Sequence, residues 1–262
     1  MEERIKEGYV KVEQAEGIAT IEFFHPQSNS LPSELLKKLT NAIETEGFNK
    51  DTKVIILRSA GEKVFCAGAS FDELANINSI EQGQSFFSGF ANVINAMRKT
   101  PQLIIARIQG KCIGGGVGLA AAADYTIAVE NADIKLSELA VGLGPFVVGP
   151  AVERKIGLSA FSQLTIDAAM WRSADWARRK GLFAELHNDI NGMEDSIKRL
   201  SITLARSNPA AMFELKKVFW KGTDHWDQLL LERAAISGKL ILSEHSKLFI
   251  STFKETRSGF KA

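Results

Sequence analysis

Two glycine-rich segments could bring backbone N–H groups close to a ligand. The first is residues 66–70 (CAGAS), and the second is residues 113–119 (IGGGVGL), which follows an apolar run and opens onto an alanine-rich stretch. Glycine has no Cβ to keep a ligand away, and the first turn of a helix carries N–H groups without a partner inside the helix. A turn of this kind can bind an anion or stabilise an oxyanion that develops during a reaction.

One carboxylate, that of Glu138, lies in the largely apolar run 134–141, just before the turn 142–145 (GLGP). A carboxylate in an apolar pocket has a raised affinity for protons, and it can exchange a proton with a substrate near neutral pH. Most glutamates at loop edges are instead solvated surface charges. The residue pattern alone leaves both interpretations of Glu138 open.

Strands and helices alternate around these residues. Apolar runs and spacing predict strands at 9–13, 18–24, 54–58, 103–108 and 125–129, and helices that begin at Pro32 and at Ile80. Ser70 followed by Glu73 fits a capping box, so a further helix should begin just beyond residue 69. From about residue 159 the pattern is helical, with predicted helices at 161–170, 173–181, 193–206, 209–220, 226–242 and 244–253. This order predicts an α/β core rich in parallel strands, with ligand-binding loops at one end of them.

Composition limits the classes of partner. The chain has 262 residues, 45% of them hydrophobic, which suits one main domain, and its net charge of +1 gives no footprint for nucleic acid. The charged residues 1–7 do not resemble a secretion signal, and no apolar run is long enough to span a membrane. Cys66 and Cys112 cannot build a disulfide framework, and the four histidines lack metal-ligand spacing. We therefore expect a cytoplasmic protein without a metal site, and we interpret both cysteines as buried small side chains rather than nucleophiles.

The two glycine segments, in this order and spacing, resemble the signature of the crotonase superfamily, the enoyl-CoA hydratase and isomerase group. Residues 25–31 (HPQSNSL), 137–142 (SELAVG) and 173–177 (SADWA) extend the resemblance along almost the whole chain. It implies an α/β fold in which strand–strand–helix units repeat as a spiral. Residues 1–200 would form this core with the acyl-CoA site, and residues 201–262 a helical region that makes oligomer contacts and covers the site. A homotrimer or a dimer of trimers is implied.

The same resemblance assigns roles within the site. It implies that the N–H groups of Ala69 and Gly115 stabilise a thioester enolate and that Glu138 transfers the proton. Coenzyme A would enter as part of the substrate, with no separate cofactor. The expected substrate-binding residues lie in or near the two glycine segments and the loop after Glu138: Lys63, Ala67, Gly68, Gly114, Gly118, Pro145 and Phe146.

Gly118 departs from the pattern of the hydratases that this chain resembles, because these carry a second glutamate at that position to help hold the attacking water. A single base can still remove a proton from one carbon and return it two carbons away, which moves a double bond. The sequence therefore favours isomerisation. Hydration remains an alternative if another acid such as Asp72 enters the site, and so does a catalytically inactive acyl-CoA-binding scaffold; decarboxylation and thioester hydrolysis also stay open. Fatty, branched and dicarboxylic acyl groups are equally compatible with the sequence.

Overall fold

A six-stranded sheet forms one wall of the core. The computed structural model describes residues 8–259. The strand order is β1 (Tyr9–Ala15), β2 (Ile18–Phe24), β3 (Val54–Ser59), β5 (Leu103–Ile108), β7 (Tyr125–Val129) and β9 (Glu185–His187). β1 and β2 form an antiparallel hairpin, and every later pair is parallel. The parallel core predicted from the sequence is confirmed.

A second, three-stranded parallel sheet contains β4 (Val64–Cys66), β6 (Lys111–Ile113) and β8 (Ile134–Lys135). The chain leaves each central strand of the large sheet, β3, β5 or β7, and next enters one strand of this small sheet. A helix then follows: α4 (Ile80–Lys99) after β4, with the short α3 (Phe71–Leu74) before it, and α5 (Gly115–Ala122) after β6. This repetition confirms the expected spiral of strand–strand–helix units.

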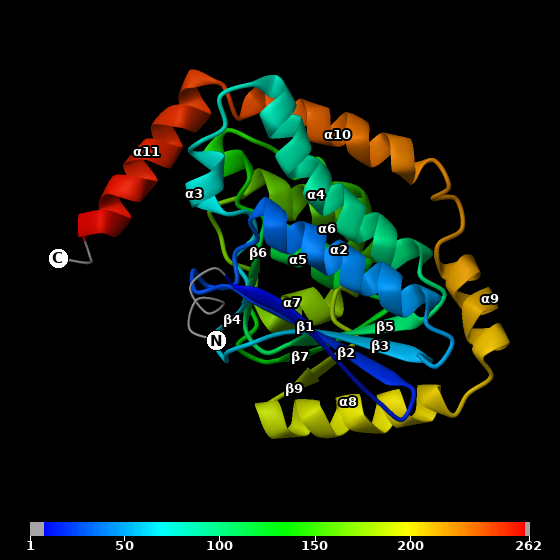
Figure 1. Ribbon diagram of the computed structural model, residues 1–262. Helices are drawn as coiled ribbons and strands as arrows, with labels where there is room; N and C mark the ends of the chain where they lie inside the picture. The colour runs from blue at the N-terminus through cyan, green and yellow to red at the C-terminus, as the bar shows by residue number, and fades with distance from the viewer. Residues whose placement is uncertain (1–7, 260–262) are drawn as a thin grey trace.

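Helices cover both faces of the large sheet. α2 (Ser33–Phe48) packs on β1 and β2, and α8 (Ile190–Ala205) lies on the opposite face (Figure 1). α2 buries Leu35, Leu36, Leu39 and Ile43, whose spacing of three and four residues places them on one side of the helix. α4 packs against α2 and along α10 (Trp226–Leu240), so α10 belongs to the same packed body as the sheets.

The remaining helices are α6 (Gly149–Ile166), α7 (Ala174–Arg179), α9 (Pro209–Phe219) and α11 (Glu244–Gly259), and a 3-10 turn, η1, covers Leu139–Val141. α11 projects from the body beside α3 (Figure 1). α6 begins before the helix predicted at 161–170 and ends at Ile166, and it is interrupted at Gly157, which has φ 76° and ψ 157°. No helix within residues 8–259 is long and apolar enough to cross a membrane.

The capping box predicted at residues 70–73 forms only in part. Ser70 Oγ accepts a hydrogen bond from the N–H of Glu73 at 3.4 Å, as expected. The Glu73 carboxylate does not return to Ser70; it accepts hydrogen bonds from the N–H of Ser33, at 2.7 Å, and from the Ser33 hydroxyl. Glu73 therefore connects α3 to the start of α2, and the helix ends after Leu74.

Candidate active site

The first glycine segment is held in place by residues 25–31. Ala67 N–H donates to Ser28 O (3.1 Å), and Leu31 N–H donates to Gly68 O (2.8 Å). Asn29, which has a positive φ of 55°, fixes this supporting loop, since its Nδ2 donates to the carbonyls of Ala60 and Val64. The motif HPQSNSL therefore supports the turn that contains Ala69.

The second glycine segment packs directly against the first. A Cβ built on Gly68 would lie 3.1 Å from the nitrogen of Gly115, and one built on Gly116 would lie 2.5 Å from the carbonyl oxygen of Cys66. Gly114 has φ 51° and ψ −116°, a conformation that L side chains rarely adopt, and its N–H donates to Lys135 O at 2.8 Å. Glycines are thus required here because two backbone segments touch.

Ala69 and Gly115, the two residues predicted to supply N–H donors, line one cavity together. Neither N–H donates a hydrogen bond to another group among residues 8–259. Gly115 is the first residue of α5, where backbone N–H groups have no partner inside the helix. The cavity therefore has two unsatisfied donors in its wall, and two such donors can bind a carbonyl oxygen that gains negative charge.

Glu138 lines the same cavity, and its carboxylate lies over the second glycine turn. A Cβ built on Gly114 would be 3.0 Å from Glu138 Oε1, and Oε2 is buried without a hydrogen-bond partner in the described part of the chain. The backbone of this residue is fixed because its carbonyl accepts from Val141 N–H (3.0 Å) and Leu143 N–H (2.9 Å). Burial raises the pKa of Glu138 to about 7. The site therefore presents a carboxyl group suited to proton transfer near neutral pH.

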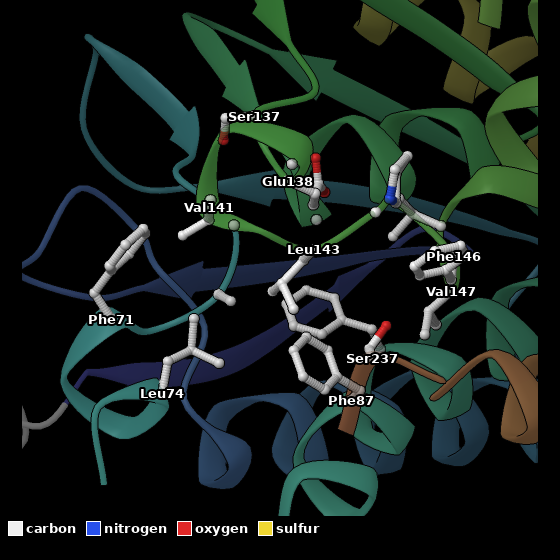
Figure 2. A pocket seen from close by; sticks show the side chains of 18 of the residues that line it. Phe71, Leu74, Phe87, Ser137, Glu138, Val141, Leu143, Phe146, Val147 and Ser237 are labelled. Carbon is white, nitrogen blue, oxygen red and sulfur yellow. The ribbon is translucent and has the colours of Figure 1, made fainter. Parts of the chain in front are cut away.

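The rest of this cavity, which we call the inner cavity, is mostly apolar. Figure 2 shows Glu138 at one side, with Phe87 and Ser237 at the opposite side. Pro145 and Phe146, both predicted to bind substrate, are in its wall, as are Ala67, Gly68 and Gly114. Residues from α3, α4, α10 and the 137–148 segment complete it: Phe71, Leu74, Phe87, Phe90, Ser137, Val141, Leu143, Gly144, Val147, Val148 and Ser237.

Two predicted binding residues lie elsewhere. Gly118 does not line the inner cavity: a Cβ built on it would be 2.4 Å from Val148 Cγ1, so the Val148 side chain occupies the adjacent space. Lys63 is exposed and lines neither the inner cavity nor the groove outside it. Its backbone carbonyl instead accepts a hydrogen bond from Lys111 N–H at 3.2 Å.

A wider groove, which we call the outer groove, adjoins the inner cavity. The two share the residues Ala67, Ala69, Phe71, Ser137 and Val141. Beyond them the polar residues of the outer groove are Gln27, Ser28, Ser30 and Lys135, and Phe249 and Phe253 of α11 lie along it. Its single cation among the described residues is Lys135, whose Nζ is 4.7 Å from the centre of the Trp171 ring.

The two cysteines lie beneath the glycine turns and are fully buried. Burial raises the pKa of the Cys66 thiol to about 12 and that of Cys112 well above its usual value. Since the thiolate is the nucleophilic form, these surroundings support the interpretation of both as packing residues. No group of three or more His, Cys, Asp or Glu side chains in residues 8–259 is arranged to hold a metal ion.

Comparison with known proteins identifies the class of protein. A sequence model of the enoyl-CoA hydratase/isomerase family matches residues 13–261, so the chain belongs to this family of enzymes. It is 31% identical over 236 residues to mitochondrial methylglutaconyl-CoA hydratase of Mus musculus, covering 87% of this chain and 74% of the relative. It is 28% identical over 257 residues to short-chain-enoyl-CoA hydratase of Clostridium acetobutylicum, with 96% and 97% coverage. Enoyl-CoA hydratase from Bacillus halodurans has the same fold, with a TM-score of 0.86, 21% identity, and coverage of 93% and 99%.

Sequence reasoning missed several residues of the inner cavity. Phe87 and Phe90 lie on the apolar face of the helix predicted to begin at Ile80, but apolar spacing does not separate side chains that fill a core from those that line a cavity. Val148 and Ser237 had no local signal, because α6 and α10 bring them to the site from distant parts of the sequence.

Proposed function

We propose that this enzyme acts on acyl-CoA thioesters and moves a carbon–carbon double bond between the β,γ and α,β positions, with Glu138 as its single proton carrier. The Glu138 carboxylate removes a proton from the α-carbon, and the electrons of that C–H bond pass to the thioester oxygen as a dienolate. The protonated carboxyl group then returns the proton to the γ-carbon. The composition of the substrate is unchanged, and no water is consumed.

The N–H groups of Ala69 and Gly115 would stabilise the dienolate oxygen. Their lack of partners within the described chain and their position in the wall that also holds Glu138 support this role. Loss of one donor of this kind typically costs about 2.7–4 kcal/mol in the activation barrier. Ala67, Gly68, Gly114, Pro145 and Phe146 are in the wall of the inner cavity and remain candidate substrate-binding residues. Lys63 and Gly118 do not line this cavity, so any contact that they make with the substrate would lie outside it.

The packing of Gly118 against Val148 is the observation that carries the choice of isomerisation. Among the described residues that line the inner cavity and the outer groove, Glu138 alone has a carboxyl group. A glutamate at position 118 would collide with Val148. Asp72 does not line either space; its side chain is exposed and accepts a hydrogen bond from Gln27. The described part of the chain therefore supplies no second acid at this site to hold and activate water.

Hydration is the second candidate, and the names of the relatives favour it. Both the mouse and the clostridial relatives are hydratases of enoyl-CoA thioesters. In that reaction Glu138 would activate water for attack on the β-carbon, without help from a second carboxylate.

The decisive experiment supplies 3-hexenoyl-CoA and 2-hexenoyl-CoA separately and follows conjugation by absorbance and product mass by mass spectrometry. We expect 3-hexenoyl-CoA to give 2-hexenoyl-CoA without a gain in mass. A 3-hydroxyacyl product would instead support the hydratase, and binding without turnover of either thioester would support a scaffold.

The same assay tests the role of Glu138. Glu138→Gln should lower turnover by roughly 100-fold or more, because the amide cannot accept the proton. Affinity for saturated hexanoyl-CoA should stay within about twofold, since the amide keeps the shape of the side chain. Glu130→Gln serves as the matched control, because the Glu130 side chain is exposed. Unchanged turnover in Glu138→Gln would remove Glu138 from the mechanism.

A further inference from the structure

The inner cavity and the outer groove differ in the side chains that line them, and this difference orients an acyl-CoA. Amide and hydroxyl side chains and Lys135 line the outer groove, whereas the inner cavity beyond Ala69 is formed mainly by Leu, Val and Phe side chains. Phosphates and polar groups of coenzyme A therefore fit the outer groove, and the acyl group fits the inner cavity, with the thioester between them at the residues that both spaces share.

The far side of the inner cavity is closed by the crossing of α4 and α10. Phe87 and Phe90 come from α4 and Ser237 from α10, and all three are at least nine-tenths buried. Next to Ser237 the two helices touch through their backbones, since a Cβ built on Gly83 would lie 2.7 Å from the Cα of Gly238. An acyl chain that reaches this side cannot pass between the helices into solvent.

No cation is available at this closed side. Among the described residues that line the inner cavity there is no Lys, Arg or His, and the one charged group is the acid Glu138. The Ser237 hydroxyl is the polar group at the far wall, and it donates to Arg233 O at 3.3 Å. A carboxylate at the end of an acyl chain would therefore lose its water, find no ion-pair partner and share the cavity with another carboxyl group. Burial of an unpaired charge is strongly unfavourable.

We infer that the acyl group of the substrate is an uncharged hydrocarbon whose end is buried against α4 and α10, and that dicarboxylic acyl groups are excluded. This inference rests on the proposed function, because it takes the inner cavity to be the acyl site. It selects among the fatty, branched and dicarboxylic groups that the sequence leaves equally open. Position 237 is the specificity-determining position, because its side chain meets the chain end.

The test measures binding of two saturated thioesters of equal carbon number, hexanoyl-CoA and adipoyl-CoA, by calorimetry. Neither has a double bond to move, so the result does not depend on turnover. Hexanoyl-CoA should bind at least about 100-fold more tightly than adipoyl-CoA, because burial of an unpaired carboxylate is costly. Equal affinity for the two thioesters would overturn the inference, and so would tighter binding of adipoyl-CoA.

Variants at the far wall test the assigned cause. Ser237→Lys should reduce the preference at least tenfold by supplying a partner for the terminal carboxylate, while Ser237→Met, of similar length but neutral, should keep it. If Ser237→Lys does not fold, Leu143→Lys with Leu143→Met as control makes the same comparison from another residue of the wall. If lysine at neither position 237 nor position 143 changes the preference for hexanoyl-CoA over adipoyl-CoA, the electrostatic explanation is contradicted.

The outcomes also separate this inference from the proposed function. Preference for hexanoyl-CoA without isomerisation of 3-hexenoyl-CoA would refute the reaction and leave the acyl class standing. Isomerisation together with equal binding of adipoyl-CoA would refute the acyl class alone. Failure to bind either saturated thioester would overturn both.

Discussion

Glu138 has a buried Oε2 without a hydrogen-bond partner in the described chain, and its backbone carbonyl accepts two hydrogen bonds that fix its position. Desolvation, rather than a neighbouring charge, raises its pKa to about 7. Its proton affinity therefore follows from the apolar wall around it. Substitutions that admit water should lower this pKa even where they leave Glu138 itself unchanged.

The raised pKa of Glu138 sets the expected pH dependence of the reaction. A base must be deprotonated to act, so kcat/KM for 3-hexenoyl-CoA should rise about tenfold per pH unit below pH 7 and level off above it. Initial rates at low substrate concentration between pH 5 and 9 would check this. A plateau that begins near the usual glutamate pKa of about 4.3 would contradict the buried environment of the free enzyme.

The contact between Gly118 and Val148 predicts how the site can be altered. Gly118→Glu alone should destabilise the protein by about 1–3 kcal/mol, since the new side chain has no room beside Val148. Val148→Gly removes both Cγ1 and Cβ, the two atoms in conflict, so the double variant should recover stability and form 3-hydroxyhexanoyl-CoA from 2-hexenoyl-CoA.

Thermal unfolding and product mass measure these two effects. Val148→Gly alone is the control, and it should not add water, because it lacks the second carboxylate. A Gly118→Glu variant as stable as the parent chain would show that Val148 does not restrict this position.

Residue patterns pointed to the glycine turns, and the family resemblance added Glu138, Pro145 and Phe146; all of these line the inner cavity. The contact of Gly118 could not be found in this way. A glycine in a helix can make room either for a ligand or for a neighbouring side chain. The neighbour here, Val148, lies 30 residues further along the chain. Only the packing of α6 on α5 distinguishes the two.

At the scale of elements, α9 is attached to the sheet by a buried ion pair. Lys216 Nζ is 3.0 Å from Asp124 Oδ2, with both side chains less than 5% exposed, and it also donates to Gln102 O at 2.7 Å. Asp124 Oδ1 accepts from Trp220 Nε1 at 3.0 Å, and burial lowers the pKa of Lys216. These contacts connect the end of α9 to the residues that directly precede β5 and β7.

We expect Lys216→Met to destabilise the protein by about 3–5 kcal/mol, because it leaves the Asp124 carboxylate buried without its cation. Adding Asp124→Asn should recover much of this loss. Urea unfolding of the single and double variants measures both effects, with Lys217→Met as the matched control, since that neighbouring lysine is exposed. A cost for Lys216→Met as small as that of the control would mean that the pair contributes little.

Most long elements other than α6 were predicted closely, whereas the three strands of the small sheet were not predicted. The strand at 103–108 and the helix that begins at Ile80 agree with the structure, because a run of six or more residues gives a clear apolar pattern. β4, β6 and β8 have two or three residues each, which is too few for a period to emerge. They are nevertheless the strands that lead into the two glycine turns and Glu138.

At the scale of the whole molecule, the inner cavity draws on both regions proposed from the sequence. Ser237 of α10 lies in its wall, and α10 packs along α4, so the region 201–262 contributes to the site itself. Phe249 and Phe253 of α11 lie along the outer groove, which agrees with a covering role. The division at residue 200 and the trimeric or hexameric assembly remain predictions.

The backbone contact of Gly83 with Gly238 has a consequence for how this enzyme could diverge. A methyl group at either glycine would force α4 and α10 apart beside Ser237, because its carbon would lie less than 3 Å from the backbone of the other helix. Descendants could therefore gain longer substrates through mutations in two helices that take no part in proton transfer.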